Sequence, residues 1–573
     1  MADSDVSIAF VGSGGAGVLT VGGMLLEAAC ATGWHGFLTR SVGAQIRGGE
    51  AAAMVRLASH PIDCHSDCFD LLIGVDWNNA QRFEAEIPLG PHSLVIGDPR
   101  GGEPPQNVAS AGARVADVAF KDMIKAQPAW RANMIALGIA AKLIGLPQDA
   151  VRAVLGKRFG AKAPAAIETN LAAVDAGATA AAQLDLGRPL TAPVKTDAKR
   201  WLISGNEAVA LGAVRGGIRF AAVYPITPAT DILEWLASNL ARVGGVMLQA
   251  EDELASINMI IGASYGGTPA LTATSGPGLS LMVEALGLAT AAEIPIVVVD
   301  VMRGGPSTGI PTKAEQSDLN IAVYGVHGDA PRLVLAPQSV SDCVFTAQWS
   351  VYLSEALQAP AIVLSDQLIG QAQAAIERPA DLAFIGERLR ARDIAAPYQR
   401  YALGGAGVSP MAIPGTLGGQ YTADGHTHTV GGIPTGSASD HRAQLDKRRD
   451  KLETFNYGAH WATLEGEGEL AVICWGSLTG AVREAIARAR AEGFAVRLIA
   501  PRLIAPVRPK EMAAALTGVR KALVVEQSHG AQFHRYLKAH YELPERVQVL
   551  HAPGPLPLRP GEIHRALMEW RNA

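Results

Sequence analysis

Residues 269–303 read PALTATSGPGLSLMVEALGLATAAEIPIVVVDVMR, and this stretch indicates the architecture of the chain. An apolar strand pattern passes through a turn of small residues into a helix pattern, and a second, fully apolar strand follows Pro295. Strands without polar alternation are typical of parallel sheets that are covered by helices on both faces. Glu284, Glu293 and Pro295 interrupt the run, so it predicts a buried helix and strand and not a membrane span.

The same alternation of strand and helix patterns extends along most of the chain. We predict an α/β sheet domain over 1–185, a linker over 186–199 and a second α/β domain over 200–380. Residues 381–465 contain a Gly- and Pro-rich arm with little periodicity. Loops of that length in compact chains are functional, cover a partner or lack order. A third, small α/β domain is predicted over 466–573.

The bulk composition restricts the classes of function. Only 5% of the residues are aromatic, the formal net charge is -5 and no basic stripe is present, so we expect no nucleic-acid partner. The first residues, MADSDVSIAF, are acidic and lack the basic region of a secretory signal. Since no stretch reads as a membrane span, we expect a cytoplasmic protein without membrane contact.

The five cysteines are too few and too scattered to predict a disulfide framework. Cys64 and Cys68 flank His65, but metal sites need three or four ligands and no second pair lies nearby. We interpret the two cysteines as ordinary thiols in a loop and expect no metal site. Cys30 and Cys474 lie in apolar patterns and are predicted core residues.

A glycine-rich loop near the N-terminus matches a nucleotide-binding pattern. The segment IAFVGSGGAGV places Gly12, Gly14 and Gly17 in the spacing G-x-G-x-x-G, between a strand and a helix pattern. Such glycines let a phosphate approach a helix N-terminus, as in NAD-binding Rossmann units. The acid that binds the ribose, expected about 20 residues further on, has no counterpart in GWHGFLTRSVG. NAD(P) or FAD, another phosphate-bearing ligand and a tight structural turn therefore stay open.

A second loop, SVGAQIRGGEAAAMVRL, holds Arg47 directly before Gly48 and Gly49. An arginine beside exposed backbone amides can hold a phosphate. A strand bend with a solvated arginine explains the same residues equally well.

The turn VYPITPATD, residues 223–231, lies between an apolar strand and a helix pattern. Pro225 restricts the residue before it to an extended conformation, which ends the strand. Thr227 before Pro228 has the form of a helix N-cap with proline at the first helical position, worth about 1 kcal/mol. The alternative is that the Thr227 hydroxyl faces a ligand, because ligands bind at the carboxyl edge of parallel sheets.

Two acids and an arginine also lie just after predicted strands. Glu251 and Glu253 precede an apolar, Gly- and Ala-rich helix that we expect to be tightly packed and buried, where a carboxylate is costly unless something binds it. Arg303 follows a fully apolar strand and precedes a run with several hydroxyl groups, Ser307, Thr308 and Thr312. The pattern predicts a carboxylate-binding cup, with a structural ion pair to Glu or Asp as the alternative.

These motifs carry a resemblance. YPITPATD, EDELASINMIIGASYGGTPALTATSGPGLSLM, RGGPSTGIPT and EQSDLN with HGD resemble the α subunit of 2-oxoacid:ferredoxin oxidoreductases. GSGGAGV with GAQIRGG resembles the γ domain of that family, here fused in front, and the third block resembles its transketolase C-terminal-like domain. The resemblance implies a multidomain α/β fold: a γ domain, a doubly wound domain of the thiamine-pyrimidine type and the transketolase C-terminal-like domain.

The resemblance also implies an activity. The family is thiamine diphosphate-dependent and oxidatively decarboxylates 2-oxoacids to acyl-CoA, passing electrons through iron–sulfur clusters to ferredoxin, and the reaction can run in reverse. Overall similarity favours 2-oxoglutarate, converted to succinyl-CoA and CO2, and pyruvate or branched-chain 2-oxoacids remain open. The alternatives are a Rossmann-type NAD- or FAD-dependent dehydrogenase and a regulatory or scaffold subunit with a vestigial pocket.

The resemblance assigns roles to single residues. Glu253 matches the glutamate that bonds N1′ of the thiamine pyrimidine and so promotes removal of the C2 proton. Arg303 matches the arginine that binds the 2-oxoacid carboxylate, and Thr227 matches a threonine that touches the substrate oxygens. Thr312 resembles a further substrate-side hydroxyl, and Lys313 is the nearest cation for a second carboxylate.

In the γ domain, the resemblance implies a CoA or phosphate site in the two glycine-rich loops. Ala16 stands where the glycine loop of the family usually has Gln. The candidate residues are Gly12, Gly14, Gly15, Arg47 and Gly48.

Two family features are missing from the chain. It has no GDG signature for the diphosphate-bound metal, and no four-cysteine ferredoxin motif. We therefore expect a β subunit that carries the Mg²⁺–diphosphate half and the iron–sulfur cluster, with thiamine diphosphate across the interface and a dimer of αβ heterodimers as the assembly. His426 and His428 lie in a loop that could cover the active site or contact this partner. Solvated loop histidines are the alternative.

Overall fold

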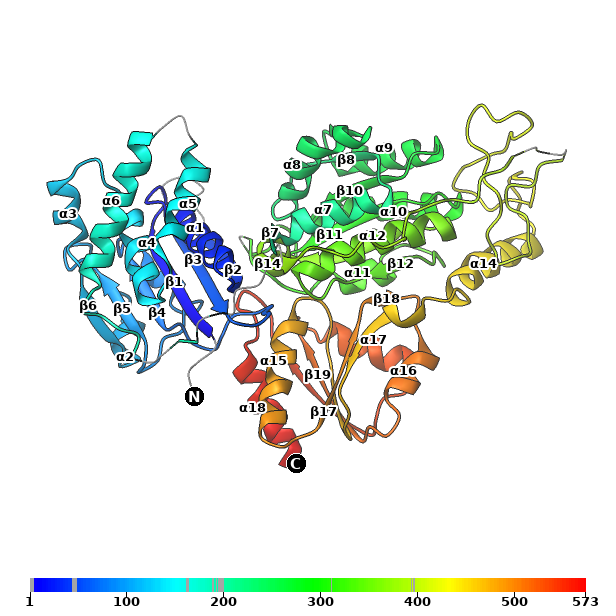
Figure 1. Ribbon diagram of the computed structural model, residues 1–573. Helices are drawn as coiled ribbons and strands as arrows, with labels where there is room; N and C mark the ends of the chain where they lie inside the picture. The colour runs from blue at the N-terminus through cyan, green and yellow to red at the C-terminus, as the bar shows by residue number, and fades with distance from the viewer. Residues whose placement is uncertain are drawn as a thin grey trace. The chain divides into compact units, whose positions relative to one another are not determined.

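The computed structural model describes residues 5–43, 49–160, 164–187, 190–191, 193, 200–310, 312–392, 394 and 397–572. The chain forms two compact units (Figure 1). The first consists of Met1–Ile203, Ala372–Arg378 and Arg559–Gly561, and the second of Ser204–Gln371, Pro379–Leu558 and Glu562–Ala573. Both contain sheets flanked by helices, which confirms the predicted multidomain α/β class.

The first unit is built on a mixed sheet with the strand order β6-β5-β4-β1-β3-β2-β14-β7. Apolar helix faces cover this sheet, and the helix predicted after the glycine loop is present as α1. The strands are β1 (Asp5–Ser13), β2 (His35–Val42), β3 (Glu50–Ala58), β4 (Leu71–Gly74), β5 (Leu94–Gly97), β6 (Arg114–Asp117), β7 (Arg200–Ser204) and β14 (Gln373–Glu377). The helices are α1 (Val18–Ala31), α2 (Gln106–Ser110), α3 (Phe120–Ala126), α4 (Ala132–Leu143), α5 (Gln148–Phe159) and α6 (Pro164–Ala180), with a 3₁₀ turn at Ala80–Phe83.

The strand arrangement around β1 differs from that of a dinucleotide-binding fold. β1 pairs antiparallel with β3 and parallel with β4, while β2, the strand that follows α1, pairs antiparallel with β3. In a Rossmann unit the strand after the first helix lies parallel beside the first strand. The glycine pattern therefore lacks the structural context that an NAD or FAD site requires.

The second unit contains a sheet with the order β18-β12-β13-β11-β10-β8-β9. Strands β8 to β13 are parallel, as predicted, and β18 of the C-terminal region adds to the edge antiparallel to β12. The strands are β8 (Phe220–Val223), β9 (Val246–Gln249), β10 (Ala270–Thr274), β11 (Val297–Met302), β12 (Leu333–Leu335), β13 (Ala361–Asp366) and β18 (Leu503–Ala505). The helices are α7 (Gly205–Gly216), α8 (Thr230–Asn239), α9 (Glu253–Tyr265), α10 (Gly276–Ala291), α11 (Leu319–Tyr324), α12 (Val340–Leu357) and α13 (Gln367–Gln371), with a 3₁₀ turn at Leu240–Val243.

The C-terminal α/β region has its own sheet, with the order β15-β17-β16-β19-β20. It is held to the middle sheet by the Gln316 side chain, which donates to the Trp475 carbonyl (2.9 Å) and accepts from the Gln527 amide (2.9 Å). The strands are β15 (Ala462–Glu465), β16 (Leu470–Ile473), β17 (Val496–Pro501), β19 (Lys521–Glu526) and β20 (Arg546–His551). The helices are α15 (Leu478–Ala491), α16 (Pro509–Ala515), α17 (Gln532–His540) and α18 (Pro560–Asn572), with a 3₁₀ turn at Gly458–Trp461.

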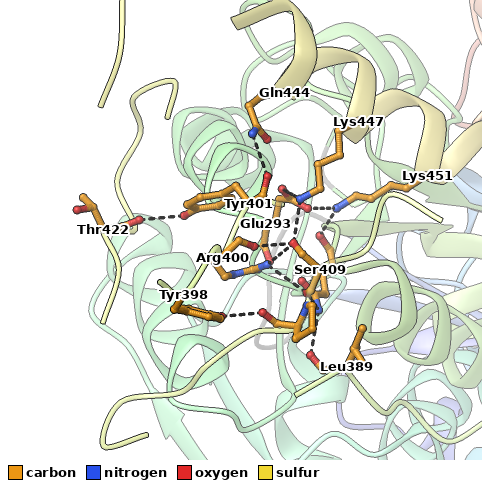
Figure 2. A network of polar contacts seen from close by, with 12 residues as sticks. Glu293, Leu389, Tyr398, Arg400, Tyr401, Ser409, Thr422, Gln444, Lys447 and Lys451 are labelled. Carbon is orange, nitrogen blue, oxygen red and sulfur yellow. Dashed lines mark hydrogen bonds and ion pairs between the residues drawn. The ribbon is translucent and has the colours of Figure 1, made fainter. Parts of the chain in front are cut away.

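The arm between the two regions of the second unit is irregular over residues 397–437 and then forms α14 (Ala438–Glu453). The sequence does not predict this helix, because most residues of α14 are charged and show no apolar face. Two of its lysines are nevertheless buried. Lys447 and Lys451 contact the carboxylate of Glu293, just after α10, at 2.6 Å and 2.8 Å (Figure 2).

Glu293 is the centre of the contacts that hold the arm to the parallel sheet. Arg400, itself fully buried, donates to the Glu293 backbone carbonyl (2.9 Å), and Ser409 accepts from Lys447 (3.0 Å) (Figure 2). Burial alone would raise the pKa of Glu293, but Lys451, Lys447 and Arg400 outweigh burial and lower this pKa to about 2. The carboxylate is therefore charged at neutral pH and fully paired.

His428 in the arm does not fit the interpretation as a solvated loop histidine. Its ring is fully buried and stacks on Tyr401, with ring centroids 4.0 Å apart and planes 6° apart. Burial lowers the pKa of His428. His426 does fit that interpretation, because its side chain is 77% exposed. Its Nδ1 atom lies 3.3 Å from Asp424 Oδ2.

Candidate active site

Glu253 is the first residue of α9, and its position follows from the cap before it. The Asp252 carboxylate accepts a hydrogen bond from the Ala255 amide (2.7 Å), which starts the helix and points Glu253 inward. Glu253 is 7% exposed, whereas Glu251 is exposed. Within the described ranges, no residue donates a hydrogen bond to the Glu253 carboxylate. A buried carboxylate in this state can accept a hydrogen bond from a ligand.

The carboxylate of Glu253 fits against a glycine. A Cβ atom at Gly278, near the start of α10, would come within 2.7 Å of Glu253 Oε1 and 2.1 Å of Thr274 Oγ1. A larger residue at 278 would therefore displace both side chains. Ser275, the N-cap of α10, has a buried hydroxyl that bonds to none of the described residues. Glu253 and Ser275 are thus two polar groups at neighbouring helix starts with unmet hydrogen-bonding capacity.

One face of α9 is exposed, which corrects the expectation that this helix is wholly buried. Leu254, Asn258, Met259 and Gly262 lie on this face, and α9 packs through its other face on β8, β10 and α10. The apolar composition of α9 suggested complete burial. Composition alone does not distinguish a helix face that packs in the core from a helix face that a partner covers.

The predicted cap at Thr227 is wrong. Residues 227–229 form a turn, with the Ile226 carbonyl accepting from the amides of Ala229 (2.8 Å) and Thr230 (3.1 Å), and α8 begins only at Thr230. The peptide bond between Thr227 and Pro228 is cis. The Thr227 hydroxyl is exposed and makes no hydrogen bond to a described residue.

Arg303 lies next to this turn. Its Nη1 donates to the Thr227 backbone carbonyl (2.7 Å), while its Nε is buried and unpartnered among the described residues. No ion pair to a described acid is present, so the alternative of a structural ion pair is not seen. The remaining guanidinium donors can receive an anion.

Arg303 opens into a cavity of about 930 Å³. The predicted hydroxyl residues Ser307 and Thr308 line it, whereas Thr312 and Lys313 are not among its lining residues. The backbone carbonyl of Lys313 accepts from the Gly304 amide (2.9 Å), and Thr312 has a left-handed backbone (φ 37°). The other lining residues are Gly276, Pro277, Ser280, Gly305, Pro306, Ile310, Glu315, Ser317, Asp318, Asn320, Ile321, His529, Gln532, Pro553 and Gly554.

Sequence reasoning missed several residues around this cavity. Asp300 is wholly buried on β11, and Asp318 lines the cavity. An acid inside the apolar run VVVDVM is a signal that could have marked Asp300. His529 and Gln532 come from the C-terminal region, and Gln532 donates to the Ser317 carbonyl (2.8 Å). No local motif marks a wall residue that is so distant in sequence.

The glycine loop of the first unit is fixed by an acid. Asp76 accepts from the Ser13 amide (3.0 Å) and the Ser13 hydroxyl (2.8 Å), and it lies against Gly12. The Gly14 amide donates to the Gly49 carbonyl, whereas Gly15 (φ 95°) has open space beside it. Arg47 and Gly48 lie outside the described residues. The backbone amides of Ser13 and Gly14 therefore already donate hydrogen bonds within the protein, and the open side of the loop is at Gly15.

The loop with Cys64 and Cys68 is held by polar contacts to its neighbours. His65 shares a hydrogen bond with the Thr39 hydroxyl (2.6 Å), and Cys64 Sγ accepts from Arg56 (3.6 Å). Over the described ranges, no group of three or more His, Cys, Asp or Glu side chains is arranged to hold a metal ion. Cys474 is buried as predicted, whereas Cys30 is only partly buried.

None of the helices in the described part of the chain is both long enough and apolar enough to cross a bilayer.

Three family models match the chain. Pyruvate flavodoxin/ferredoxin oxidoreductase, thiamine diP-binding, covers 211–447, pyruvate ferredoxin/flavodoxin oxidoreductase covers 7–180, and pyruvate:ferredoxin oxidoreductase core domain II covers 468–554. The first match spans Glu253, Arg303 and the arm as far as residue 447 in α14. The third spans all four C-terminal residues that line the cavity, His529, Gln532, Pro553 and Gly554.

Named relatives agree with these models. The 2-oxoglutarate synthase subunit KorA of Methanothermobacter marburgensis is 36% identical over 375 residues, which cover 64% of this chain and 96% of the relative. The 2-oxoglutarate oxidoreductase subunit KorA of Mycobacterium tuberculosis is 36% identical over 64% of this chain and 57% of its own length. A solved structure, the 2-oxoglutarate:ferredoxin oxidoreductase from Magnetococcus marinus with 2-oxoglutarate, coenzyme A and succinyl-CoA bound, is 34% identical, with a TM-score of 0.92 over 99% of both chains.

The sheets, the buried glutamate and these matches define an oxidoreductase. More narrowly, the chain belongs to the 2-oxoacid:ferredoxin oxidoreductase family, as an α subunit with a γ domain fused to its N-terminus.

Proposed function

We propose that the chain is the α subunit of an enzyme that converts 2-oxoglutarate, CoA and oxidised ferredoxin into succinyl-CoA, CO2 and reduced ferredoxin, and that the reaction also runs in reverse. The choice of 2-oxoglutarate is supported by the KorA relatives and by the ligands of the Magnetococcus marinus enzyme. The observation that carries the proposal is the buried, unpartnered Glu253 carboxylate in a thiamine diphosphate-binding domain. Pyruvate and branched-chain 2-oxoacids are the alternative substrates.

The residues present fit thiamine diphosphate. Its aminopyrimidine offers N–H groups, and Glu253 offers an acceptor that no described residue occupies, in a space kept open by Gly278. When bound, the cofactor supplies the carbon nucleophile and the electron sink for loss of CO2. Glu253 holds a proton at the pyrimidine ring nitrogen, and the positive end of α9 stabilises the charge that this carboxylate carries.

The substrate carboxylate binds to Arg303 in this proposal. The contact between Arg303 Nη1 and the Thr227 carbonyl fixes the guanidinium and leaves its other donors for a planar carboxylate. The unbonded Thr227 hydroxyl then lies beside the substrate oxygens. Thr312 and Lys313, on the loop that follows Arg303, stay in the proposal as a hydroxyl and a cation for the second carboxylate of 2-oxoglutarate.

A partner subunit is part of the proposal. The exposed apolar face of α9 follows directly on Glu253, and Leu281 on the adjoining α10 is 50% exposed. We propose that a β subunit covers this surface, bringing Mg²⁺, the diphosphate half of the cofactor site and the iron–sulfur cluster that reduces ferredoxin. The assembly is a dimer of αβ heterodimers and works in the cytoplasm, where free cysteines such as these stay reduced.

The first unit is the proposed site of CoA. Gly15 forms the open side of the glycine loop, next to Gly12 and Gly14, and leads into the N-terminus of α1, where a phosphate is favourable. Arg47 and Gly48 complete the candidate set on sequence grounds. Replacing Arg47 with alanine tests this site and should raise the KM for CoA while leaving the KM for the 2-oxoacid unchanged.

Co-purification with the β subunit, followed by dye reduction that depends on CoA and on a series of 2-oxoacids, tests the proposed function. We expect turnover that requires thiamine diphosphate and is fastest with 2-oxoglutarate. Bound NAD(H) with no requirement for thiamine would overturn the proposal, and faster turnover of pyruvate or a branched-chain 2-oxoacid would overturn the substrate.

A further inference from the structure

Two acids have no role in the function proposed so far: Asp318 lines the proposed substrate cup, and Asp300 lies on β11. Asp300 is on β11 between Val299 and Val301 and is 0% exposed. Asp318 directly precedes α11, and its carboxylate lies against Gly276, where a Cβ atom would come within 2.6 Å of Oδ2. Among the described residues, none donates a hydrogen bond to either oxygen of Asp300 or to Oδ2 of Asp318.

The two carboxyl groups satisfy each other only if they share a proton. An ionised carboxylate without a donor is costly in the interior, and two adjacent ones cannot both be ionised. Burial, and then Asp318, raise the pKa of Asp300 well above its usual range. Burial also raises the pKa of Asp318 to about 7, with Glu315 adding to the increase and Asp300 and Arg303 opposing it. Both shifts favour the protonated form at this pair of acids.

Asp318 also lines the 930 Å³ cavity, beside Arg303. The other charged or titratable groups that line this space are Glu315, from the loop after β11, and His529, from the C-terminal region. The start of α10, on the remaining side, contributes no charged residue from Gly276 to Ser280. Whether Asp318 is neutral or ionised thus changes the charge of the cup that Arg303 offers to an anion.

We propose that Asp318, through a proton shared with Asp300, sets the charge of the substrate cup and is a positioning and specificity-determining residue for the 2-oxoacid. With both acids protonated, the cup holds the positive Arg303 beside a neutral acid and accepts the substrate anion. With Asp318 ionised, its charge competes for Arg303 and repels the substrate. The inference rests on the proposed function and deepens it, because it adds a reason for discrimination between anionic and neutral ligands.

The direction in which the KM for 2-oxoglutarate changes with pH follows from the coupling between protonation of Asp318 and binding of the substrate. A substrate anion that raises the pKa of Asp318 by one unit binds about tenfold more weakly to the ionised form. The KM for 2-oxoglutarate should therefore be lowest below pH 7 and rise as Asp318 loses its proton. Since Asp318 does not touch the reacting atoms, kcat should not follow the same titration.

The test is the pH dependence of kcat and KM in the reconstituted αβ complex. In the wild type we expect the KM for 2-oxoglutarate to rise about tenfold between about pH 6 and about pH 9, with kcat following a different profile. Asp318→Asn is neutral at every pH and should keep the low KM throughout. Asp329→Asn removes the same charge outside the cavity lining and should retain the wild-type profile. An Asp318→Asn complex with the wild-type rise in KM would overturn the inference.

A second variant addresses the shared proton directly. Asp300→Leu keeps the approximate size of the side chain but removes the hydrogen bond by which Asp300 lowers the pKa of Asp318, so the increase in KM should begin at higher pH than in the wild type. An unchanged midpoint would contradict the shared proton even if Asp318→Asn proves unstable. A wild-type complex that oxidises no 2-oxoacid would overturn the proposed function together with this inference. An active complex with a flat KM profile overturns the inference alone.

Discussion

At the scale of single residues, the backbone decides which acid can act. Glu251 and Glu253 are two residues apart, but only Glu253 follows the Asp252 cap, enters the helix and becomes buried. The sequence motifs predicted Glu253, Thr227 and Arg303, and the structure brings the last two into contact. Only the N-cap interpretation of Thr227 is wrong, because a proline after threonine is equally compatible with a turn that precedes the helix. The contact of Thr227 with the substrate stays a prediction.

Glu253→Gln should abolish most of the turnover while leaving assembly intact. The amide keeps the size of the side chain but cannot hold the proton, and general acid–base groups contribute about 10²- to 10⁴-fold to rate. Dye reduction by the reconstituted complex measures the loss, and size-exclusion chromatography checks assembly. Turnover at the wild-type level in Glu253→Gln would refute the catalytic role.

Arg303→Lys should raise the KM for the 2-oxoacid with less effect on kcat. Lysine keeps the charge but loses the fork that bonds both a planar carboxylate and the Thr227 carbonyl. Loss of charge-assisted hydrogen bonds of about 1.5–3 kcal/mol corresponds to a KM increase of roughly 10- to 100-fold. Steady-state kinetics over a range of 2-oxoglutarate concentrations measures the change. An unaltered KM would remove Arg303 from the substrate site.

At the scale of elements, α14 shows that the pattern of a charged segment does not predict which of its residues are buried. Its composition reads as a solvated helix or as part of a loop, yet Lys447 and Lys451 are buried on Glu293. The strands were predictable because short, continuous apolar runs seldom form any structure other than a buried strand. Helix α14 was not, since its stability depends on an acid more than 150 residues earlier in the chain.

Glu293→Gln should destabilise the fold and loosen the arm. Removing the charge leaves two buried lysines without a counter-ion, and breaking a buried pair costs about 3–5 kcal/mol. Urea unfolding measures the stability, and limited proteolysis of residues 398–437 reports on the arm. The matched control is Asp450→Asn on the same helix, an exposed partner of Arg449, which should change stability by less than about 0.5 kcal/mol. Equal effects of both variants would contradict the role of Glu293.

The same residue should contribute to acid sensitivity. Its pKa in the fold, about 2, lies below the ordinary value of 4.5, so the unfolded chain binds more protons in this interval. The stabilisation by Glu293 is complete above pH 4.5 and is lost as the pH falls toward 2. The free energy of unfolding, measured from pH 6 downwards, should decrease less steeply in Glu293→Gln than in the wild type. Parallel curves would show that the pairing is not retained at low pH.

At the scale of the whole molecule, the multidomain α/β class was visible in the sequence, whereas the enclosure of the cavity was not. The parallel sheet follows from its apolar strands, but His529 and Gln532 reach the cavity only because the C-terminal region packs on residues 315–320. Exposed apolar residues can also be identified only from the whole molecule. In the sequence they cannot be distinguished from apolar residues of the core.

Met259→Glu should prevent association with the β subunit without unfolding the chain. Met259 is 41% exposed on the apolar face of α9, and a charge there opposes burial against a partner. Co-purification measures assembly, and circular dichroism checks the fold. Leu417→Glu, at a residue of the arm that is 92% exposed, is the control and should assemble normally. Normal assembly of Met259→Glu would show that the partner binds elsewhere.

The pairing of β18 with β12 places the C-terminal region beside the cavity that Arg303 lines. The antiparallel strand closes one edge of the middle sheet, and the Gln316–Gln527 contact closes the junction beside it. If the proposed function holds, grafting the Arg303 loop alone between relatives would therefore leave the wall formed by His529, Gln532, Pro553 and Gly554 mismatched. A chimera with exchanged substrate preference should then require transfer of the last domain together with the middle one.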